Sequence, residues 1–297
     1  MGDEVIKEYF VERDNGNFFL AKEKADSPFF KTANFETVWN LQFEKTVKFV
    51  RKERATGFLH IEGFGKVYIK RGEFNLLKTF FNTLFKFTKQ VSSLDGEAKA
   101  IMRLAELNIK TTPVIAFGSK TVFWKRRSFL VTQDVGDHPR LEHYFPQRFG
   151  NSSAGEDFKS RCAFIVSLAS LLAKMHKGGV SHRDLYGCHI FVVETGSGWE
   201  FIILDLNRAD VRKTVRTRWI VKDLSALAAS VPSVSKADGL RFLKTYLGVS
   251  HLDENSRNLA HKIIKRIEKI KRRIRRSKEK DLHLVSKHGG ALPENKE

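Results

Sequence analysis

The chain has 297 residues, 41% hydrophobic and 29% charged, a composition typical of a folded protein large enough for two lobes with a cleft between them. Lysine and arginine outnumber aspartate and glutamate by 53 to 34, so the net charge of +19 predicts an anionic partner such as nucleic acid, an acidic membrane or a phosphorylated substrate. The chain has only two cysteines, which argues against a disulfide framework. No apolar run reaches the ~18 residues of a membrane span. The N-terminus lacks the pattern of a signal peptide, so the cytoplasm is the expected compartment.

The first half of the chain contains strand and helix patterns after a phenylalanine-rich N-terminal region, 1–50, that has no clear periodicity. Alternating apolar residues around a Gly63–Gly65 turn predict a β-hairpin, and apolar residues three and four apart predict two helices. The expected elements are a hairpin at 56–71, helices at 74–89 and 95–108, a buried strand at 128–134 and a loop between lobes at 137–157.

The second half begins with a leucine- and alanine-rich helix that Gly178 and Gly179 end. Two apolar strands follow, separated by the turn sequence TGSG, and further helical patterns come after them. The expected elements are helices at 159–177, 223–230 and 239–247 and strands at 189–194 and 201–206.

The C-terminal segment 262–280 carries 11 basic and 2 acidic side chains, a net charge of +9. Five isoleucines between positions 263 and 274 fall on one side of a helix. A basic amphipathic helix is typical of elements that bind a membrane surface or a partner, and it equally suits a final helix packed on a lobe with its charged face in water. Both interpretations stay open, whereas nucleic-acid binding has no recognisable motif in the chain.

The segment His182-Arg183-Asp184 follows a helix and a glycine pair and precedes a strand. In protein kinases a His-Arg-Asp segment in this setting is the catalytic loop, whose aspartate faces the acceptor hydroxyl. Three residues also occur together by chance, so this motif alone does not separate a kinase loop from an ordinary turn.

The residues around this motif complete a kinase-like order. Lys70 ends the strand sequence VYIK, and Glu97 lies 27 residues later on a predicted helix. Asp205 ends a predicted strand 21 residues after Asp184. In kinases the strand lysine contacts the nucleotide phosphates, a helix glutamate pairs with the lysine, and the strand-end aspartate holds magnesium. The ordered set therefore predicts phosphoryl transfer, with Asp184 and Lys70 as the catalytic residues.

The nucleotide-binding pattern departs from that of protein kinases because no GxGxxG precedes Lys70. We expect Gly57 to cover the phosphates instead, and Gln133 and Asp134, at the end of the strand 128–134, to contribute to nucleotide binding together with Glu97.

The metal-binding segment also departs from that pattern. Asp205-Leu206-Asn207 replaces Asp-Phe-Gly, and the following segment, 209–220, is short. A short segment leaves little room for an activation loop or a peptide platform, which favours a small, non-peptide acceptor.

Longer segments resemble the lipopolysaccharide kinases of the Kdo/WaaP type. SHRDLYGCHIF at 181–191 is similar to the HRD-x-Y-x-CH-F core of that family, and LDLNRADVR at 204–212 to its IDLHRA-type segment. RTRWIVKDLSAL at 216–227 is similar to its RW-x-x-KDL-x-x-L segment, and 96–118 to its acidic helix before a proline-containing strand. The resemblance spans roughly residues 54–247 and fits the heptose-kinase branch better than the Kdo-kinase branch.

The resemblance implies a bilobal, protein-kinase-like α+β fold, with a small β-rich lobe at 1–134, a larger helical lobe at 135–261 and the basic helix and tail at 262–297. It implies ATP and Mg²⁺ as cofactors and a heptose of the lipopolysaccharide inner core as acceptor, with no nucleic-acid partner. It also implies action at the anionic surface of the cytoplasmic face of the inner membrane. The alternatives are a bacterial protein kinase and a catalytically inactive kinase-like protein that binds anionic membranes.

The same resemblance assigns roles to the motif residues. Lys70 neutralises phosphate charge, Glu97 positions Lys70, and Asp205 binds the metal. Asp184 orients the sugar hydroxyl. His189 stands where protein kinases carry a metal-binding asparagine, so it is a second candidate metal ligand. An ordinary imidazole would lose that ability as the pH falls through about 6.5; a hydrogen bond to Asp184 or to a phosphate, or simple packing, is the alternative.

Two further features concern the residues after Asp205. Asp223 resembles the buried helix aspartate that braces the catalytic loop of kinases, and a helix N-cap is the alternative. Basic side chains between 208 and 218 match the carboxylates and phosphates of the implied acceptor, although a solvated loop would also carry such charges. The expected substrate-binding residues are Arg208, Arg212, Lys213, Arg216 and Arg218.

Overall fold

The computed structural model describes residues 3–49, 54–80, 93–150 and 155–287. The chain divides into two compact units. Unit 1 comprises Met1–Glu106, Thr111–Asp137 and Leu206–Arg208, and unit 2 comprises Leu107–Lys110, His138–Asp205 and Ala209–Glu297. A sheet-rich and a helix-rich unit agree with the expected α+β class, while the domain boundaries after residues 134 and 261 stay a prediction.

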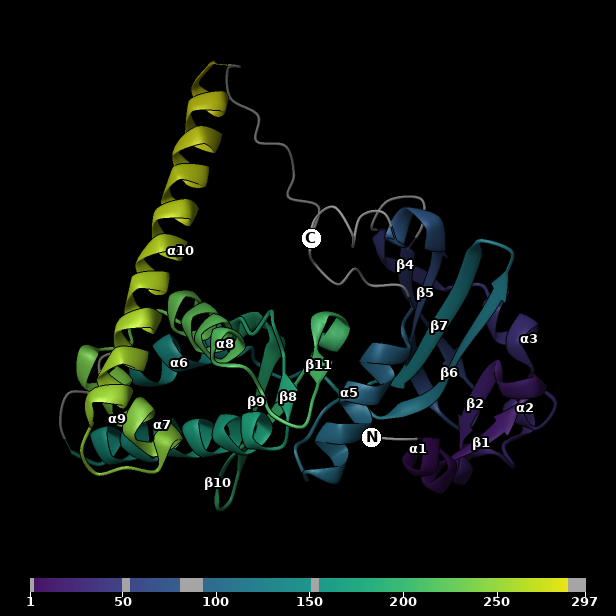
Figure 1. Cartoon of the computed structure of the whole chain (residues 1–297), viewed down its shortest axis with the longest axis horizontal. Coiled ribbons are helices and arrows are strands. Elements are labelled where there is room, and N and C mark those ends of the chain that lie inside the picture. The colour runs from purple at the N-terminus through teal and green to yellow at the C-terminus, as the bar shows by residue number, and fades with distance from the viewer. Residues whose placement is uncertain (1–2, 50–53, 81–92, 151–154, 288–297) are drawn as a thin grey trace. The chain divides into compact units, whose positions relative to one another are not determined.

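Unit 1 is built on a seven-stranded antiparallel sheet within the described residues, with the strand order β1-β2-β6-β7-β5-β4-β3 (Figure 1). The helix expected at 95–108 is α5, Asp95–Glu106, and it packs against β6 and β7. Helical backbone is described at 76–80, and residues 81–89 of the helix expected there lie outside the described residues. The strands are β1 (Phe10–Arg13), β2 (Phe18–Ala21), β3 (Lys45–Phe49), β4 (Arg54–Ile61), β5 (Gly65–Asn75), β6 (Val114–Val122) and β7 (Lys125–Gln133).

The N-terminal region without clear periodicity supplies much of the core of unit 1. Phe18, Phe30 and Phe35 are completely buried against the sheet, which explains part of the phenylalanine enrichment. Asn34 starts a short helix by reciprocal capping with Thr37. Elements this short leave little periodic signal in the sequence. The helices are α1 (Asp3–Tyr9), α2 (Pro28–Lys31) and α3 (Phe35–Trp39), with 3₁₀ turns η1 (Asp14–Gly16) and η2 (Lys22–Lys24).

The hairpin expected at 56–71 is present as β4 and β5. Gly63 and Gly65 form its turn with φ of 80° and 69°, a left-handed backbone that favours glycine. Gly57 is buried in the middle of β4, where a Cβ atom would lie 2.4 Å from the ring of Phe43. Close packing against Phe43 explains why this position is a glycine, and its role in covering phosphates stays a prediction.

Unit 2 is mostly helical. The expected strands at 189–194 and 201–206 form a hairpin that begins and ends close to those positions, and the helix expected at 223–230 begins six residues earlier, at Thr217. The helices are α6 (Leu141–Phe149), α7 (Gly155–Lys177), α8 (Thr217–Ser230), α9 (Lys236–Leu247) and α10 (Glu254–Lys287), and the strands are β8 (Val180–Ser181), β9 (Ile190–Thr195), β10 (Gly198–Ile203) and β11 (Asp210–Val211), with 3₁₀ turns η3 (Gly187–His189) and η4 (Leu206–Arg208).

The prediction of a loop at 137–157 is wrong for the central part of this segment, because α6 forms there. Leu141, Tyr144, Phe145 and Phe149 repeat at helical spacing and are all buried. Their rings and those of neighbouring elements pack together, with Phe149 and Phe164 5.3 Å apart between centroids. This apolar face stabilises a helix that local turn-forming residues and an internal proline would otherwise disfavour.

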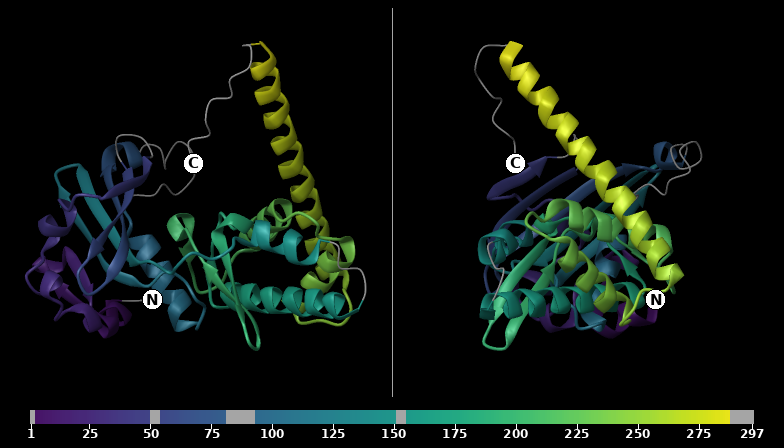
Figure 2. Two further views of the ribbon diagram at one scale, coloured as in Figure 1. Left: turned by 180° about the vertical axis from the view of Figure 1, so that it is seen from behind. Right: turned by 90° about the vertical axis from the view of Figure 1, so that its left-hand side faces the viewer.

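Helix α10 packs against α8 at its start and then extends away from the other helices of unit 2 (Figure 1, Figure 2). Ile263 is buried and lines an apolar cavity of about 550 Å³, whereas Ile264 and Ile274 are 54% and 42% exposed. Packing of the helix on unit 2, one of the two interpretations left open, is therefore present at Ile263. Within the part of the chain that the structure describes, no helix is both long and apolar enough to cross a membrane.

Candidate active site

Lys70 and Glu97 form an ion pair within unit 1. Lys70 lies on β5 opposite Leu130 of β7, and Glu97 lies in the first turn of α5. Lys70 Nζ donates to Glu97 Oε1 at 2.5 Å, and the glutamate side chain is only 4% exposed. A carboxylate this deeply buried is stable as an anion only beside a cation. The pairing expected from the 27-residue spacing is therefore present, and it directs the ammonium group of Lys70.

We expect Lys70→Ala to lower kcat/KM for phosphoryl transfer by about 10²–10³-fold, the usual effect of removing one donor that stabilises developing charge. Glu97→Gln keeps an oxygen acceptor beside Lys70 and should have a smaller effect. Steady-state kinetics give the rates, and thermal unfolding of each variant reveals any loss of fold, because Lys70→Ala leaves Glu97 buried without its cation. A Glu97→Gln enzyme slower than the Lys70→Ala enzyme would contradict a supporting role for Glu97.

The His-Arg-Asp loop of unit 2 is held by Asp223. This aspartate is completely buried inside α8, where its two carboxylate oxygens accept the backbone N–H groups of His182 at 2.8 Å and Arg183 at 2.7 Å. His176 Nε2 donates to the same carboxylate at 3.3 Å. The bracing role predicted for Asp223 is confirmed, and the N-cap alternative is wrong because α8 already begins at Thr217.

His182 connects this loop to the segment that carries Asp205. The imidazole of His182 is fully buried, and its Nε2 donates to the carbonyl of Leu204 at 2.8 Å. Burial lowers the pKa of His182, so the ring is neutral. Leu204 N–H in turn donates to the carbonyl of His189 at 2.9 Å. Asp184 and Asp205 therefore lie on two segments that are joined by hydrogen bonds.

Both segments carry a residue with left-handed backbone, which is uncommon for residues other than glycine. Arg183 has φ 64° and Asp205 has φ 53°. Such conformations raise the free energy of the folded state and persist only where surrounding contacts hold them. Here the hydrogen bonds to Asp223 and Leu204 hold the two segments in these conformations. The side chain of Asp205 remains 43% exposed.

His189 lies between the two acidic segments. Its Nδ1 donates to the backbone carbonyl of Asp184 at 2.8 Å, and its Nε2 lies 3.7 Å from Asp205 Oδ2. Burial favours the neutral ring, but the contact with the Cys188 sulfur, the Asp184 carbonyl and the charge of Asp205 together outweigh it and raise the pKa of His189 to about 9. The midpoint near pH 6.5 expected from the sequence is therefore wrong for the metal-free protein.

The raised pKa predicts how His189 contributes to stability. A histidine whose pKa is higher in the folded state stabilises the fold fully below its unfolded pKa of about 6.5 and loses that contribution as the pH rises through about 9. The free energy of unfolding, measured with urea in the presence of EDTA, should be about 1–3 kcal/mol higher for wild type than for His189→Gln at pH 6. This range allows for solvent screening of Asp205. The difference should shrink above pH 9. A difference that does not change with pH would contradict the ion pair.

The metal expected at this position is best matched by Asp205. Among the described residues, no group of three or more His, Cys, Asp or Glu side chains lies close enough together to hold a metal ion. Mg²⁺, however, often binds through one or two carboxylates plus substrate phosphates and water. The exposed Asp205 carboxylate suits that mode, and His189 as a second metal ligand stays a prediction.

The other residues expected to bind nucleotide lie in unit 1. Gln133 ends β7, where its N–H donates to the carbonyl of Pro113. The carboxylate of Asp134 lies 3.3 Å from Lys66 Nζ and accepts the N–H of Gly136 at 3.3 Å, so it already has partners within the unit. Their contribution to nucleotide binding stays a prediction.

Four of the five basic residues expected to bind substrate belong to unit 2, at and just before the start of α8 in the sequence. Arg212, Lys213, Arg216 and Arg218 are exposed in unit 2, and Arg212 Nε also pairs with Asp210 at 2.5 Å. Arg208 lies on η4, which belongs to unit 1.

Arg183 is a residue of this surface that the sequence analysis did not assign. Its guanidinium lies 4.2 Å from the ring of Trp219, and Arg218 lies 4.7 Å from the same ring. The buried Nε of Arg183 has no hydrogen-bond partner. The motif itself contained the signal, because Arg183 is the arginine of His-Arg-Asp.

A sheet that carries a lysine–glutamate pair, with a His-Arg-Asp loop braced by a helix aspartate, defines a phosphotransferase of protein-kinase-like fold. Residues 34–246 match the lipopolysaccharide kinase (Kdo/WaaP) family, and the chain belongs to this family. As a kinase it uses ATP as co-substrate.

Individual relatives agree with this assignment. The lipopolysaccharide core heptose(I) kinase WaaP of Escherichia coli strain K12 is 32% identical over 231 residues, which are 73% of this chain and 85% of that protein. The protein of the same description from Pseudomonas aeruginosa strain PAO1 is 34% identical over 158 residues, 50% of this chain and 58% of that protein. A solved structure of WaaP in complex with acyl carrier protein has a TM-score of 0.65 at 25% identity and covers 88% of this chain and 97% of the other.

Proposed function

We propose that this chain transfers the γ-phosphate of ATP to a heptose hydroxyl of the lipopolysaccharide inner core. The observation that carries this proposal is the match to heptose(I) kinases along 73% of the chain. The family match at 34–246 includes the Lys70–Glu97 pair and the segments of Asp184 and Asp205. The short segment after Asp205 supports a sugar acceptor over a protein, since it provides no peptide platform.

The residues act mainly by positioning and by neutralising charge. The carboxylate of Asp184 accepts a hydrogen bond from the acceptor hydroxyl and orients its oxygen toward the phosphate. Lys70, held by Glu97, offsets the charge of the phosphate oxygens. Asp205 would hold Mg²⁺, which when bound neutralises phosphate charge. His189 ties the Asp184 and Asp205 segments together.

The basic surface at the start of α8 suits an acceptor that carries carboxylates and phosphates. Arginine side chains form paired hydrogen bonds with such oxyanions. The exposed Arg212, Arg216 and Arg218 and the stacked Arg183 provide this chemistry near the catalytic loop within unit 2. We place the enzyme at the cytoplasmic face of the inner membrane, where an anionic surface would attract a chain of net charge +19.

The test is phosphorylation of core oligosaccharide that lacks the heptose phosphate, by purified chain with ATP and Mg²⁺, followed by mass spectrometry. Wild type should add a phosphate to a heptose, and core isolated from cells without the protein should lack it. Transfer to general protein acceptors but not to oligosaccharide would favour a protein kinase. No transfer to either, with nucleotide still bound, would favour an inactive kinase-like protein.

A further inference from the structure

The turn between β6 and β7 carries an exposed apolar tip. Val122, Phe123 and Trp124 are 47%, 90% and 61% exposed. Leu77, 42% exposed, lines the same open hollow of about 640 Å³, and Phe80, 63% exposed, follows three residues later in the helical stretch 76–80. Leu77, Val122, Phe123 and Trp124, here called the β6–β7 tip, are four of the 14 exposed large hydrophobic side chains in the described part of the chain.

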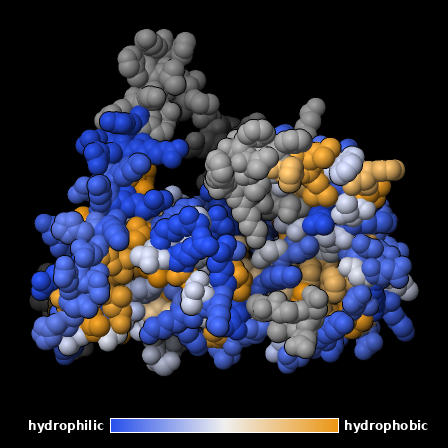
Figure 3. Space-filling view, viewed as in Figure 1, coloured by the Kyte–Doolittle hydropathy of each residue, from blue (hydrophilic) through white to orange (hydrophobic). Residues whose placement is uncertain are grey.

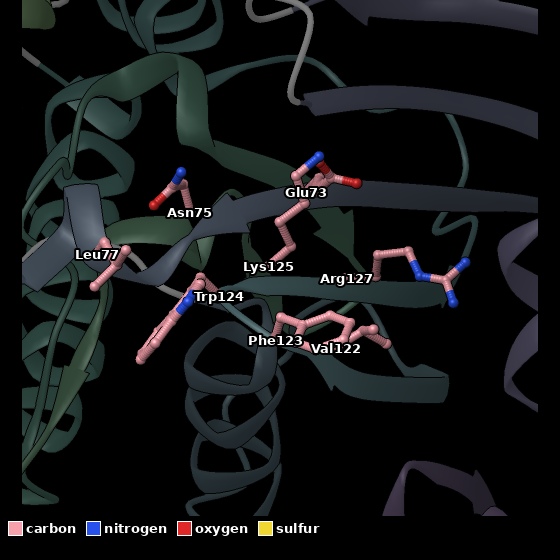
Figure 4. Close-up of a pocket in the computed structure, with 8 residues that line it drawn as sticks. All are labelled: Glu73, Asn75, Leu77, Val122, Phe123, Trp124, Lys125 and Arg127. Carbon is pink, nitrogen blue, oxygen red and sulfur yellow. The ribbon is translucent and has the colours of Figure 1, made fainter.

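The conformation of the tip presents its aromatic rings outward. Figure 4 shows Leu77 and Trp124 side by side and directed away from Arg127, and hydrophobic residues gather at the end of this hairpin in Figure 3. Phe123 has φ 52°, a backbone that turns usually assign to glycine or asparagine. A bulky ring in that position, almost fully in water, adds nothing to the core, which indicates that the tip contacts another surface.

The hairpin that carries the tip is basic. Residues 114–133 contain four basic and no acidic side chains. Lys120 and Arg127 pair with Glu36, and Lys125 pairs with Glu73, so these two acids leave a net charge of 4 − 2 = +2. Exposed aromatic rings flanked by lysine and arginine are typical of segments that enter the interface of an anionic bilayer, where tryptophan is enriched.

The size of the tip argues against a stable protein interface. Complete burial of Phe123 and Trp124 would remove about 150–250 Å² each from water, whereas a standard protein interface takes about 800 Å² per partner. A bilayer has no such requirement, because two or three inserted side chains combine with the attraction of basic groups to lipid headgroups.

We propose that the β6–β7 tip inserts into the headgroup region of an anionic bilayer and holds unit 1 at the membrane surface. The inference deepens the proposed function, since the acceptor there is part of a membrane lipid. It places membrane contact on the sheet of unit 1 and not on the basic helix α10, for which the sequence left membrane binding and packing on a lobe equally open.

The first experiment measures binding of the full chain to vesicles of phosphatidylcholine and phosphatidylglycerol by co-sedimentation. Phe123→Ser combined with Trp124→Ser should reduce binding about tenfold or more, because two large apolar side chains no longer insert. The matched control is Phe158→Ser on α7, a phenylalanine that is 39% exposed and also lies beside an arginine, Arg241. This control should bind like wild type.

A second measurement identifies the inserted residue. Lipids brominated in their acyl chains quench tryptophans that enter the bilayer, and Trp124 is the most exposed of the four tryptophans. Quenching should be strong in wild type and largely absent in Trp124→Phe. Wild-type binding by the Phe123/Trp124 double variant would overturn the proposal. A second variant replaces four arginines of α10 by serine, and the proposal would also fail if this variant alone lost binding; the four are Arg272, Arg273, Arg275 and Arg276. A change in oligomeric state without a change in vesicle binding would assign the tip to a second copy of the chain.

Kinase assays separate this proposal from the proposed function. The double variant should phosphorylate delipidated core oligosaccharide at the wild-type rate and vesicle-embedded lipopolysaccharide more slowly. Equal wild-type and variant rates on the embedded acceptor would overturn the role of the tip while the proposed function stands. If wild type phosphorylates neither acceptor, the proposed function fails, and the vesicle-binding result still decides the membrane contact.

Discussion

Replacing Asp184 with alanine should lower the rate of phosphoryl transfer by about 10²–10⁴-fold, the contribution of a positioned acid–base group, and leave ATP binding close to wild type. The fold should survive, since alanine retains the backbone carbonyl that accepts His189 Nδ1 at 2.8 Å and the Tyr186 N–H at 3.0 Å. Single-turnover transfer to core oligosaccharide and calorimetric titration with ATP measure the two effects separately.

The matched control for Asp184→Ala is Asp157→Ala. Asp157 is an exposed carboxylate on α7 that pairs with Arg148 at the surface of the same unit. Exposed ion pairs contribute little to stability, so this variant should transfer phosphate like wild type. Near-normal transfer by Asp184→Ala would remove Asp184 from the mechanism, and a comparable loss in both variants would indicate a general charge effect.

Asp223→Ala should give the largest loss of stability, about 3–5 kcal/mol in the free energy of unfolding. The change removes the acceptor for the buried N–H groups of His182 and Arg183 and for His176 Nε2. His176 Nδ1 also accepts a hydrogen bond from the hydroxyl of Tyr246 at 2.7 Å, so the substitution removes the carboxylate from a buried hydrogen-bond network. Denaturant unfolding measures the loss, and the folded fraction should also transfer phosphate more slowly because the catalytic loop is no longer held.

Asp223→Asn serves as the conservative comparison. The amide keeps the size of the side chain and one oxygen acceptor, but its NH₂ group then faces a backbone N–H. We expect a smaller loss of about 1–3 kcal/mol, the cost of one unsatisfied buried donor. Equal unfolding midpoints and equal m-values for wild type and Asp223→Ala would show that α8 does not brace the loop.

Features that depend on neighbouring residues could be predicted from the amino-acid sequence. The alternation around Gly63 and Gly65 produces the β4–β5 hairpin, and helical spacing produces α5, because both patterns act over a few residues. The order of Lys70, Glu97, Asp184 and Asp205 indicated phosphoryl transfer before any contact was known. The motif segments were long enough to indicate the family as well.

Features that depend on residues distant in the chain became apparent from the fold. Gly57 packs under the ring of Phe43, a distant contact that leaves no space for a Cβ atom. Helix α6 forms where local turn residues predicted a loop, because its buried rings pack on neighbouring elements. The raised pKa of His189 comes from the neighbouring Cys188 sulfur, the Asp184 carbonyl and the charge of Asp205, and only the fold brings Asp205 beside the ring. Local propensity is a fraction of a kcal/mol per residue, so burial and long-range charge override it wherever the chain folds back on itself.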